Sequence, residues 1–380
     1  PHHIFFFSHT PAYALLSGLV GSEMCIRDSV GGVVERRQTL PILANVLLIL
    51  EGSRLSLTGT DLEVELVGRA TVDETTDSGE VTVPARKLMD ICKSLPEGCD
   101  IEFAVEESRA VVRSGRSRFV LSTLPARDFP NIEDGIGNQQ FTVKQGELKR
   151  LIERTSFAMA QQDVRYYLNG MLWEMSAKQF RVVATDGHRL AMCTLDTNLD
   201  IDADTQVIVP RKGVIEVSRL LQDEGAEINI AVGANHMRAT TEDFTFTSKL
   251  VDGKFPEYQR VLPKLSDKIV LGSRTELKQA FTRTAILSNE KYRGVRLLLS
   301  SSSLQIMANN PEQEEAEETV TVDYQGDSLE VGFNVSYLLD VMSVISSDTV
   351  KMSLSDPNSS ALVEEPEDGD SVYVVMPMRL

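Results

Sequence analysis

Residues Tyr166–Leu190, YYLNGMLWEMSAKQFRVVATDGHRL, hold a pattern of apolar and turn residues that occurs once before them and once after them in the chain. Its opening, Asn169-Gly-Met-Leu, is similar to Asn45-Val-Leu-Leu and, more weakly, to Gly294-Val-Arg-Leu. Its closing turn at Thr185 corresponds to Thr60, 125 residues earlier, and to Asn309, 124 residues later. The chain is therefore expected to repeat one structural unit three times.

A second set of landmarks keeps the same period. Pro84, Pro210 and Asn334 follow apolar segments at intervals of 126 and 124 residues. A period of about 125 residues is the size of a whole domain, and is too long for a solenoid or propeller repeat. We therefore expect three similar domains in tandem, at residues 30–136, 137–263 and 264–380.

Each copy is predicted to combine strands with two helices. Leu62, Val64 and Leu66 alternate with glutamates, which is typical of a strand with one buried face. Leu88, Cys92 and Leu95 share one face of a predicted helix, and the same apolar spacing follows Asn334. The predicted fold class is α+β, with two helices per domain packed against antiparallel sheets.

Residues 1–29 fit neither of the other copies. In the second copy the corresponding place holds a strand at Phe141 and an amphipathic helix at Glu147, and the third copy has the same pair at Ile269 and Glu276. A signal peptide does not explain the segment, because no Lys or Arg precedes its apolar part. We expect the segment to be an assembly or gene-boundary artefact, so that the first domain lacks its usual first strand and helix.

The composition is that of an ordinary globular protein, with 42% hydrophobic and 25% charged residues. The four cysteines form no CxxC pair and have no histidine at metal-binding spacing, so we expect a reduced, cytosolic setting and no zinc site. The net charge of −18 argues at first against nucleic acid as a partner. Net charge does not describe distribution, however, and the placement of the bases decides this question.

Lys and Arg recur on the polar faces of the predicted helices in every copy, as at Arg86, Lys149, Arg211 and Lys278. For any single helix, a solvated face with ordinary ion pairs is an equally good interpretation. Recurrence in all three copies favours a shared basic surface.

Two further charged segments oppose each other. Arg113, Arg116 and Arg118 make a basic strand in the first domain, and Glu312–Glu318 is an acidic run in the third. The acidic run lacks the glycine turns of an oxygen-ligand metal loop, so no metal is expected there. Solvated surface is one interpretation, and a head-to-tail contact between the two segments is the other.

The segment around Asp186 and His188 is the one place where an acid, a histidine and a turn come together. A catalytic dyad would need a nucleophile beside it, and the corresponding turn at Thr60-Asp61 has no histidine. Phosphate-binding, zinc-protease and nucleophile-elbow motifs are absent from the sequence. These observations favour a binding protein over an enzyme, with a hydrolase acting at Asp186 and His188 as the alternative.

The chain ends on VYVVMPMRL, residues Val372–Leu380. A packed final strand explains Val372–Val375. Met376–Leu380 are better explained as the lining of a groove, because methionine suits surfaces that accept several partners.

From Val30 to Leu380 the sequence resembles the bacterial DNA polymerase III beta subunit family, the replicative sliding clamps, most closely its proteobacterial members. The segments that carry the resemblance include GTDLE, VPARK, RSGRSRF, QDVRYYLNG, ATDGHRLA, SKLVDGKFPEY, NNPEQEEAEE and VVMPMRL. The resemblance implies the DNA clamp fold, with two chains closing a six-domain ring around duplex DNA. It implies a non-catalytic processivity factor with no cofactor and no metal.

The resemblance also assigns three sets of residues. The DNA-contacting positions, of which Arg211 and Lys212 are added from their charge alone, are Arg37, Arg86, Gln162, Tyr166, Tyr167, Arg211 and Lys212. The partner-peptide groove comprises Leu168, Thr185, Gly187, His188, Arg189, Leu190, Pro256, Arg260, Val261, Tyr292, Asn334, Tyr337, Ser360, Val374, Val375, Met376, Pro377, Met378, Arg379 and Leu380. The dimer interface comprises Arg113, Arg116, Arg118, Phe119, Leu121, Ile286, Leu287, Glu312, Glu314, Glu315, Glu317 and Glu318.

The implied partners are double-stranded DNA bound without sequence preference, a second copy of the chain, the clamp loader, and polymerases and repair proteins that carry clamp-binding motifs. No membrane partner is expected, and the implied location is the cytoplasm, at the nucleoid. A DNA-independent protein scaffold, in which the basic helices are merely solvated, is a third interpretation beside the clamp and the hydrolase.

Overall fold

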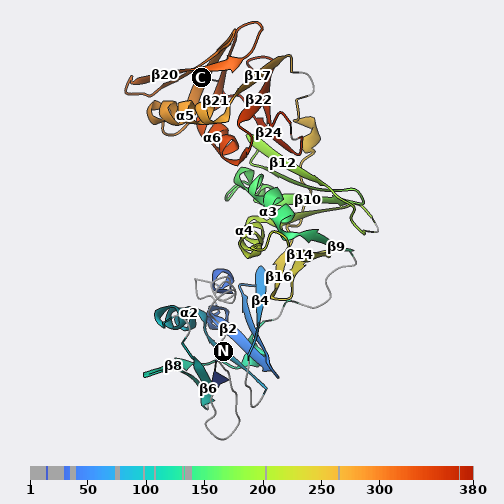
Figure 1. Cartoon of the computed structure of the whole chain (residues 1–380), viewed down its shortest axis with the longest axis vertical. Coiled ribbons are helices and arrows are strands. Elements are labelled where there is room, and N and C mark those ends of the chain that lie inside the picture. The colour runs from blue at the N-terminus through green and yellow to red at the C-terminus, as the bar shows by residue number, and fades with distance from the viewer. Residues whose placement is uncertain are drawn as a thin grey trace. The chain divides into compact units, whose positions relative to one another are not determined.

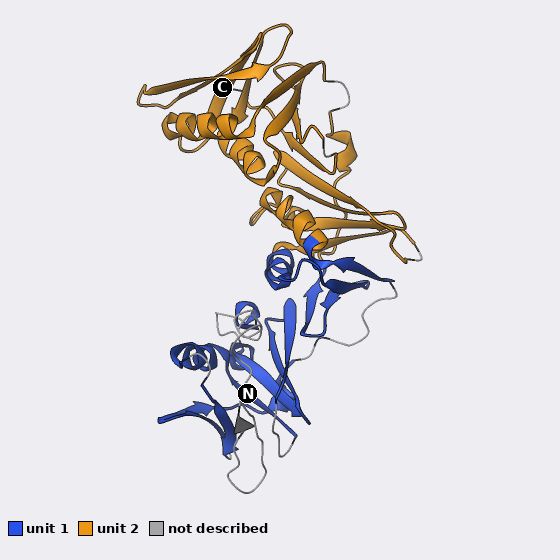
Figure 2. Cartoon of the chain, viewed as in Figure 1, with its two compact units in different colours: residues 1–146, 212–250 blue, residues 147–211, 251–380 orange. Residues whose placement is uncertain are grey.

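The computed structural model describes residues 14–15, 30–34, 40–72, 78–96, 99–106, 108–130, 132, 139–201, 203–263, 266–367 and 369–379, with backbone only at 14–15. The chain forms two compact units, residues 1–146 with 212–250 and residues 147–211 with 251–380 (Figure 2). Figure 1 traces the elements of each unit.

Unit 1 contains an eight-stranded and a four-stranded antiparallel sheet. In order across the larger sheet, the strands are β5 (Gly79–Pro84), β2 (Asn45–Glu51), β3 (Arg54–Thr60), β4 (Val64–Thr71), β16 (Phe244–Lys249), β15 (His236–Thr240), β14 (Glu227–Val232) and β9 (Gln139–Lys144). Those of the smaller sheet are β1 (Ala14–Leu15), β6 (Glu102–Glu106), β7 (Arg109–Ser114) and β8 (Ser117–Ser122). The helices are α2 (Ala85–Ser94) and, from its second residue onward, α4 (Arg211–Leu220).

Unit 2 is built on one twelve-stranded antiparallel sheet. Its order is β13 (Thr205–Pro210), β10 (Gly170–Ser176), β11 (Gln179–Thr185), β12 (Arg189–Asp196), β24 (Ser371–Val375), β23 (Ala361–Glu364), β22 (Thr349–Leu354), β17 (Lys268–Ser273), β20 (Glu315–Asp323), β19 (Ser303–Asn309), β18 (Gly294–Ser300) and β21 (Leu329–Asn334). The helices are α3 (Gln145–Glu153), whose first two residues belong to unit 1, α5 (Arg274–Thr284) and α6 (Val335–Val344).

Short 3-10 turns join these elements. They are η1 (Pro41–Ala44), η2 (Ala126–Asp128), η3 (Ser156–Ala158), η4 (Tyr166–Leu168), η5 (Tyr258–Arg260) and η6 (Ala285–Leu287).

The threefold repeat is confirmed at both sets of landmarks. Pro84, Pro210 and Asn334 each end a strand, and α2, α4 and α6 begin at the next residue. Thr60, Thr185 and Asn309 end β3, β11 and β19. The α+β fold class is therefore confirmed, with antiparallel sheets and helices in every copy.

Successive copies are joined by one recurring strand pairing. In unit 1, β4 of the first copy pairs antiparallel with β16, the last strand of the second copy. In unit 2, β12 of the second copy pairs in the same way with β24, the last strand of the third. The sheets are therefore continuous from one copy to the next, and the division into compact units falls inside the central copy.

Three details of the predicted strands are wrong. Leu62 is not part of β4, but lies in the preceding turn with φ +74° and is 37% exposed. Glu65, predicted to face solvent, is buried and accepts a hydrogen bond from the Ile132 N–H at 3.2 Å. Tyr166 and Tyr167 were expected to open a strand; they form η4, and β10 begins only at Gly170.

The start of the chain shows two elements where the first copy was expected to lack them. β1 pairs with β6 through Ala14 and Phe103, in the sheet position that β9 and β17 occupy in the other copies. Val30–Val33 are helical, and Val30 lies against Gly59, where an added Cβ would come within 2.9 Å of it. Residues 1–13 and 16–29 lie outside the described residues, so the proposed artefact stays a prediction.

Candidate functional site

The turn between β11 and β12 is held by its own side chains. Thr185 Oγ1 accepts a hydrogen bond from the Gly187 N–H at 3.1 Å and donates to the Arg189 carbonyl at 2.6 Å. Asp186 Oδ1 accepts from the N–H groups of His188 and Arg189, at 2.9 and 3.0 Å. Gly187 has φ +88°, which favours glycine.

The same turn occurs in the first copy, where Asp61 Oδ1 accepts from the N–H groups of Glu63 and Val64. The Thr-Asp pair thus holds the corresponding turn in both copies.

Asp186 contacts the backbone of His188, not its imidazole, and its second oxygen binds Arg189 Nε at 3.1 Å. The hydrolase interpretation is therefore not supported.

An apolar cavity of about 170 Å³ opens beside this turn. Leu190, Val374 and Tyr258 line it and belong to a buried cluster with Leu172 and Phe255. Of the predicted groove residues, those that line the cavity are Leu168, Thr185, Gly187, Arg189, Leu190, Pro256, Val261, Val374 and Met376. The prediction missed four further lining residues, Arg165, Tyr167, Glu257 and Tyr258.

Tyr167 was predicted to contact DNA, but it is one of the residues that line the cavity. Its ring stands edge-on to Tyr166 at 5.8 Å and lines the apolar cavity, whereas Tyr166 is 57% exposed. Two adjacent tyrosines in a 3-10 turn point to different surroundings, and the sequence carried no signal that separates them.

The C-terminal segment lies along the same region. The Met376 N–H donates to the His188 carbonyl at 2.9 Å, and the Met378 N–H donates to the Gly332 carbonyl of β21 at 2.8 Å. Val375 is wholly buried between β12 and β23, so its side chain supports the sheet and does not line the cavity. Leu380 lies outside the described residues.

The cavity lining does not include the following predicted groove residues: His188, Arg260, Tyr292, Asn334, Tyr337, Ser360, Pro377, Met378 and Arg379. Asn334 caps α6 by accepting from the Ser336 N–H at 2.8 Å. Tyr292, Met378 and Arg379 line a second, larger hollow of about 920 Å³.

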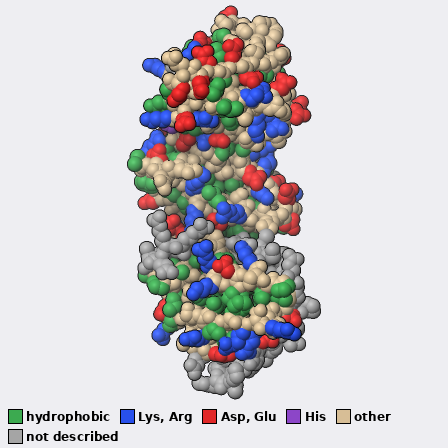
Figure 3. Space-filling model, turned by 90° about the vertical axis from the view of Figure 1, so that its left-hand side faces the viewer, with side chains coloured by type: hydrophobic (Ala, Val, Ile, Leu, Met, Phe, Trp, Pro, Cys, Tyr) green, Lys and Arg blue, Asp and Glu red, His purple; other side chains and the backbone are tan. Residues whose placement is uncertain are grey.

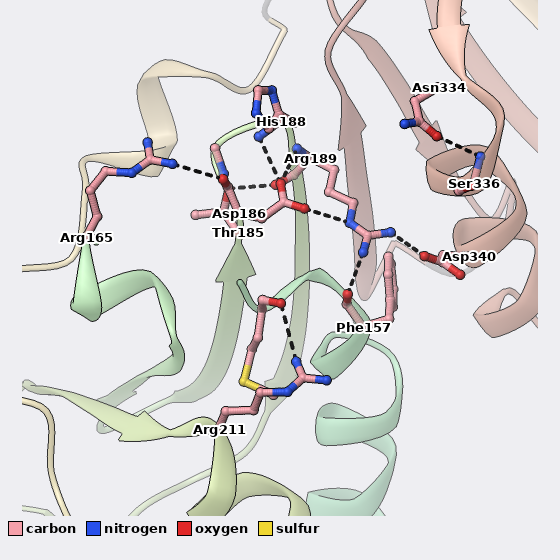
Figure 4. Close-up of polar contacts among 12 residues, drawn as sticks. Phe157, Arg165, Thr185, Asp186, His188, Arg189, Arg211, Asn334, Ser336 and Asp340 are labelled. Atoms are coloured by element: carbon pink, nitrogen blue, oxygen red, sulfur yellow. Dashed lines mark hydrogen bonds and ion pairs between the residues drawn. The ribbon is translucent and has the colours of Figure 1, made fainter. Parts of the chain in front are cut away.

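Arg189 connects the turn to α6 (Figure 4). Its guanidinium binds Asp186, donates to the Phe157 carbonyl at 2.8 Å and forms an ion pair with Asp340. It also lies 4.5 Å from the centroid of the Tyr337 ring. A planar, fork-shaped cation can satisfy all these partners at once, which a lysine could not do. The arginine therefore fixes the cavity wall to the third copy.

Tyr258 closes the back of the cavity with a polar contact. Its hydroxyl donates to Glu174 and accepts from Arg181 Nη1 at 3.2 Å. Burial, reinforced by the hydrogen bond to the Glu174 carboxylate, raises the pKa of Tyr258 to about 12. The hydroxyl thus stays protonated at neutral pH and holds η5 on the sheet.

The predicted DNA-contacting residues differ in their exposure and in whether they already have a partner within the chain. Arg86 on α2 is exposed, Gln162 is exposed with φ +55°, and Arg37 lies outside the described residues. Arg211 is half-buried and donates to the Met159 carbonyl at 3.3 Å; burial first, and then the charge of Arg189, lower its pKa. Lys212 forms an ion pair with Asp61. Figure 3 shows Lys and Arg side chains on the face turned toward the viewer, with Asp and Glu side chains among them.

Two bases at the end of the second copy's first helix, Arg150 in α3 and Arg154 just after it, contact the third copy. Arg150 pairs with Asp370 at 3.0 Å, and Arg154 pairs with Glu365 at 3.1 Å. These contacts remove them from the shared basic surface expected from the sequence.

Some of the predicted interface residues already have charged partners within the chain. Arg113 and Arg118 lie 3.7 and 3.8 Å from Glu106, and Glu318 binds Arg283. Ile286 is 73% exposed, whereas Leu121 is only 5% exposed, so little of Leu121 is available to a second chain. The remaining members are exposed or half-buried: Arg116, Phe119, Leu287, Glu312, Glu314, Glu315 and Glu317.

Among the described residues, no group of three or more His, Cys, Asp and Glu side chains is arranged to hold a metal ion. Nor does any helix in this part of the chain have the length and apolar character needed to span a membrane.

Three family models match the chain in succession. They are the N-terminal domain of the DNA polymerase III beta subunit at residues 27–133, its central domain at 142–257 and its C-terminal domain at 259–379.

Whole-chain relatives agree with these models. The beta sliding clamp of Pseudomonas aeruginosa is 64% identical over 351 residues, covering 92% of this chain and 96% of the relative. That of Escherichia coli is 54% identical over 353 residues, covering 93% and 96%. The crystal structure of the DNA polymerase III subunit beta from Pseudomonas aeruginosa superposes with a TM-score of 0.93 at 61% identity, covering 97% of this chain and all of the other. The chain therefore belongs to the DNA polymerase III beta subunit family, the bacterial sliding clamps that act as processivity factors of DNA polymerase.

Proposed function

We propose that two copies of this chain close head to tail into a ring around duplex DNA, and that the ring tethers polymerases and other partners through the apolar cavity beside the β11–β12 turn. The ring rests on one observation, the strand pairing that joins successive copies. β4 pairs with β16, and β12 pairs with β24.

By the same rule, β20 of the third copy should pair with the last strand of a following copy. The only strand of that kind left over is β8, the last strand of the first copy, which ends its sheet among the described strands. β20 meets β17 only at Val322 and Asp323, so its other edge is open along Glu315–Thr321. In a pair of chains, two β20–β8 pairings would use the β20 and β8 edges of both chains. Neither of these two edges would then stay free, which is the condition for a closed ring.

The charges at these edges support the same pairing. β8 carries Arg118, and Arg116 precedes it, while β20 carries Glu315, Glu317 and Glu318. Complementary charge on facing edges favours the heterologous contact and opposes pairing of like edges. Phe119 and the exposed Ile286 would add apolar contact to the interface.

Such a ring needs only loose contacts to phosphate, since it holds DNA by enclosing it. Arg86, Gln162 and Tyr166 are exposed and suit this role. Lys212 and Arg211 suit it less, because each already has a partner in the chain. Tyr167 is reassigned to the partner cavity.

The cavity suits short apolar peptide motifs. It is small, and Leu168, Val261 and Met376 form part of its apolar wall. A few polar groups also line it and could hydrogen-bond to the backbone of a bound peptide. Partners would include the clamp loader, DNA polymerases and repair proteins that carry such motifs. The chain itself performs no chemistry in this proposal, and it works in the cytoplasm at the nucleoid.

The test is retention on DNA. Purified protein is loaded onto a nicked circular plasmid by a clamp loader with ATP, separated by gel filtration, and compared with the same plasmid after linearisation. We expect retention on the circle and loss from the linear form, because a ring slides off an end. Equal retention on both forms would contradict the enclosing ring.

A further inference from the structure

Two rows of side chains cross one face of the sheet formed by β13, β10, β11 and β12. Residues paired across antiparallel strands lie on the same face, and so do residues two apart along a strand. The first row is apolar and contains Ile208, Leu172, Val183 and Met192. The second row, two residues away on each strand, is polar and contains Gln206, Glu174, Arg181 and Thr194. The polar row therefore borders the apolar row on the same face.

Each member of the polar row contacts the next one. Gln206 Nε2 donates to Glu174 Oε1 at 2.6 Å, and Arg181 Nε donates to Thr194 Oγ1 at 3.1 Å. Between them, Glu174 Oε2 lies 3.5 Å from Arg181 Nη1. The Glu174 and Arg181 side chains are only 15% and 28% exposed, so solvent screens this pair little. The four side chains therefore fix one another in place.

Tyr258 spans both rows. Its ring belongs to the buried apolar cluster that contains Leu172 and Val183. Its hydroxyl lies at the polar row, where it donates to Glu174 Oε2 and accepts from Arg181 Nη1 at 3.2 Å. A buried ring with a satisfied hydroxyl is held in both position and orientation.

Tyr258 in turn belongs to one wall of the apolar cavity. Pro256, Glu257 and Val261 line the cavity beside it. The Tyr258 N–H donates to the Pro256 carbonyl at 2.7 Å, and the Val261 N–H donates to the Tyr258 carbonyl at 3.0 Å. The described backbone hydrogen bonds of residues 255–261 stay inside this segment, and the Tyr258 hydroxyl reaches the sheet. The position of the wall therefore depends on apolar packing and on this polar contact.

We propose that Glu174 and Arg181 are positioning residues for partner binding, which hold the Tyr258 wall in the form that accepts an apolar peptide. The cavity lining includes neither of them, so they act through the Tyr258 hydroxyl. The inference rests on the proposed peptide cavity and assigns it two further residues. Removing the carboxylate leaves the buried hydroxyl without its acceptor, so the wall would have to be ordered again when a peptide binds. Affinity should fall even though no residue that lines the cavity has changed.

The experiment measures the peptide affinity of the full-length protein. The probe is fluorescein-labelled Gln-Leu-Ser-Leu-Phe, whose leucine and phenylalanine side chains suit the apolar cavity, and binding is followed by fluorescence polarisation. The same peptide with serine in place of its leucine and phenylalanine residues measures non-specific binding. Urea unfolding checks that each variant is folded under the conditions of the assay.

Glu174→Met should weaken binding of the probe by about three- to tenfold, the cost of ordering a side chain again on binding. Glu174→Gln should restore the affinity to within about twofold of the parent, because its amide oxygen can still accept from the Tyr258 hydroxyl. Glu364→Met is the matched control. It removes a carboxylate from a cross-strand pair with Lys351 at 3.1 Å, whose side chains are 21% and 36% exposed, and it should leave the affinity unchanged.

A double-mutant cycle tests how the effect reaches the cavity. Tyr258→Phe keeps the ring and removes the hydroxyl, so Glu174→Met should have little further effect on peptide affinity in that background. If Glu174→Met does not fold, Arg181→Met takes its place in the cycle, because Arg181 is the other partner of the hydroxyl.

The results separate the positioning role from the cavity itself. A parent protein that binds the probe no better than the serine peptide would refute the peptide cavity, and the positioning role with it. If the parent binds and Glu174→Met binds equally well, the positioning role is overturned and the proposed function stands. An equal loss of affinity with and without the Tyr258 hydroxyl, or in Glu364→Met as well, would also overturn the positioning role, since the carboxylate would then act through general stability.

Discussion

Arg154 and Glu365 form a nearly buried ion pair: Nη1 lies 3.1 Å from Oε1, and the side chains are 11% and 4% exposed. Arg154 also donates to Ser371 Oγ at 3.0 Å and to Ser346 Oγ at 2.9 Å. The pair ties the end of α3 to the segment after β23. An arginine directly after α3 thus holds the second and third copies together.

Arg154→Met should lower the free energy of unfolding of unit 2 by about 3–5 kcal/mol, because it leaves the Glu365 carboxylate buried without its cation. The measurement is the urea midpoint of the transition that includes unit 2. Arg260→Met is the matched control: its pair with Glu257 is 80% and 53% exposed, and its loss should cost less than about 1 kcal/mol. Equal shifts for the two variants would contradict a structural role for Arg154.

Gly187→Ala should destabilise the β11–β12 turn. Its φ of +88° disfavours any side chain, and an added Cβ would come within 3.0 Å of the Arg165 guanidinium. We expect a cost of about 1–3 kcal/mol and weaker binding of a short apolar peptide to the cavity, because the turn forms the cavity wall. Both effects are measured on the same protein, by urea unfolding and by fluorescence polarisation of a labelled peptide.

Gly225→Ala provides the control for that substitution. A Cβ there meets only Asp223 Oδ1, at an ordinary 3.6 Å, in the loop before β14. Near-parental stability is expected. If Gly187→Ala were equally harmless, the turn would not depend on glycine.

Arg116→Glu with Arg118→Glu should weaken the assembly of two chains by at least tenfold, since like charges would then face each other across β8 and β20. Analytical ultracentrifugation gives the dissociation constant. Arg109→Glu changes the charge of an exposed residue on β7, an inner strand of the same sheet, and should leave assembly intact. An unchanged constant in the double variant would argue against β8 as the interface strand.

The Tyr258 hydroxyl predicts a pH dependence. Its pKa in the folded chain is raised to about 12, above the roughly 10 of an unfolded tyrosine, so its contribution to stability is complete below pH 10 and is lost as the pH rises through 12. Tyr258→Phe should flatten the fall in the urea midpoint between these values. Tyr373, whose pKa burial also raises, is present in both proteins and cancels in the comparison. Parallel pH profiles for the two proteins would contradict the assignment.

The sequence predicted the repeated frame well because strand ends carry strong local signals. Pro84 and Pro210 end strands and precede helices, and Thr60 and Thr185 close strands at turns held by the following aspartate. Such contacts are local, so they are visible in the order of residues.

What the sequence could not supply were contacts made over long separations. Nothing near Arg154 in the sequence indicates Glu365, 211 residues away, and nothing near Glu65 indicates that Ile132 satisfies it. Tyr166 and Tyr167 differ only in which way a 3-10 turn points them. Charge and aromatic patterns therefore identified candidate residues but not their roles.

The half-open edge of β20 and the end strand β8 also determine how assembly of the ring could go wrong. A pairing between unlike edges closes into a ring only if the rotation from one copy to the next adds up to a full circle. If a substitution altered that angle, the same two edges would still attract each other, but each added chain would leave a new edge exposed. The product would be an open filament that grows with concentration, so in this family a shape error in the sheet would be a route to aggregation.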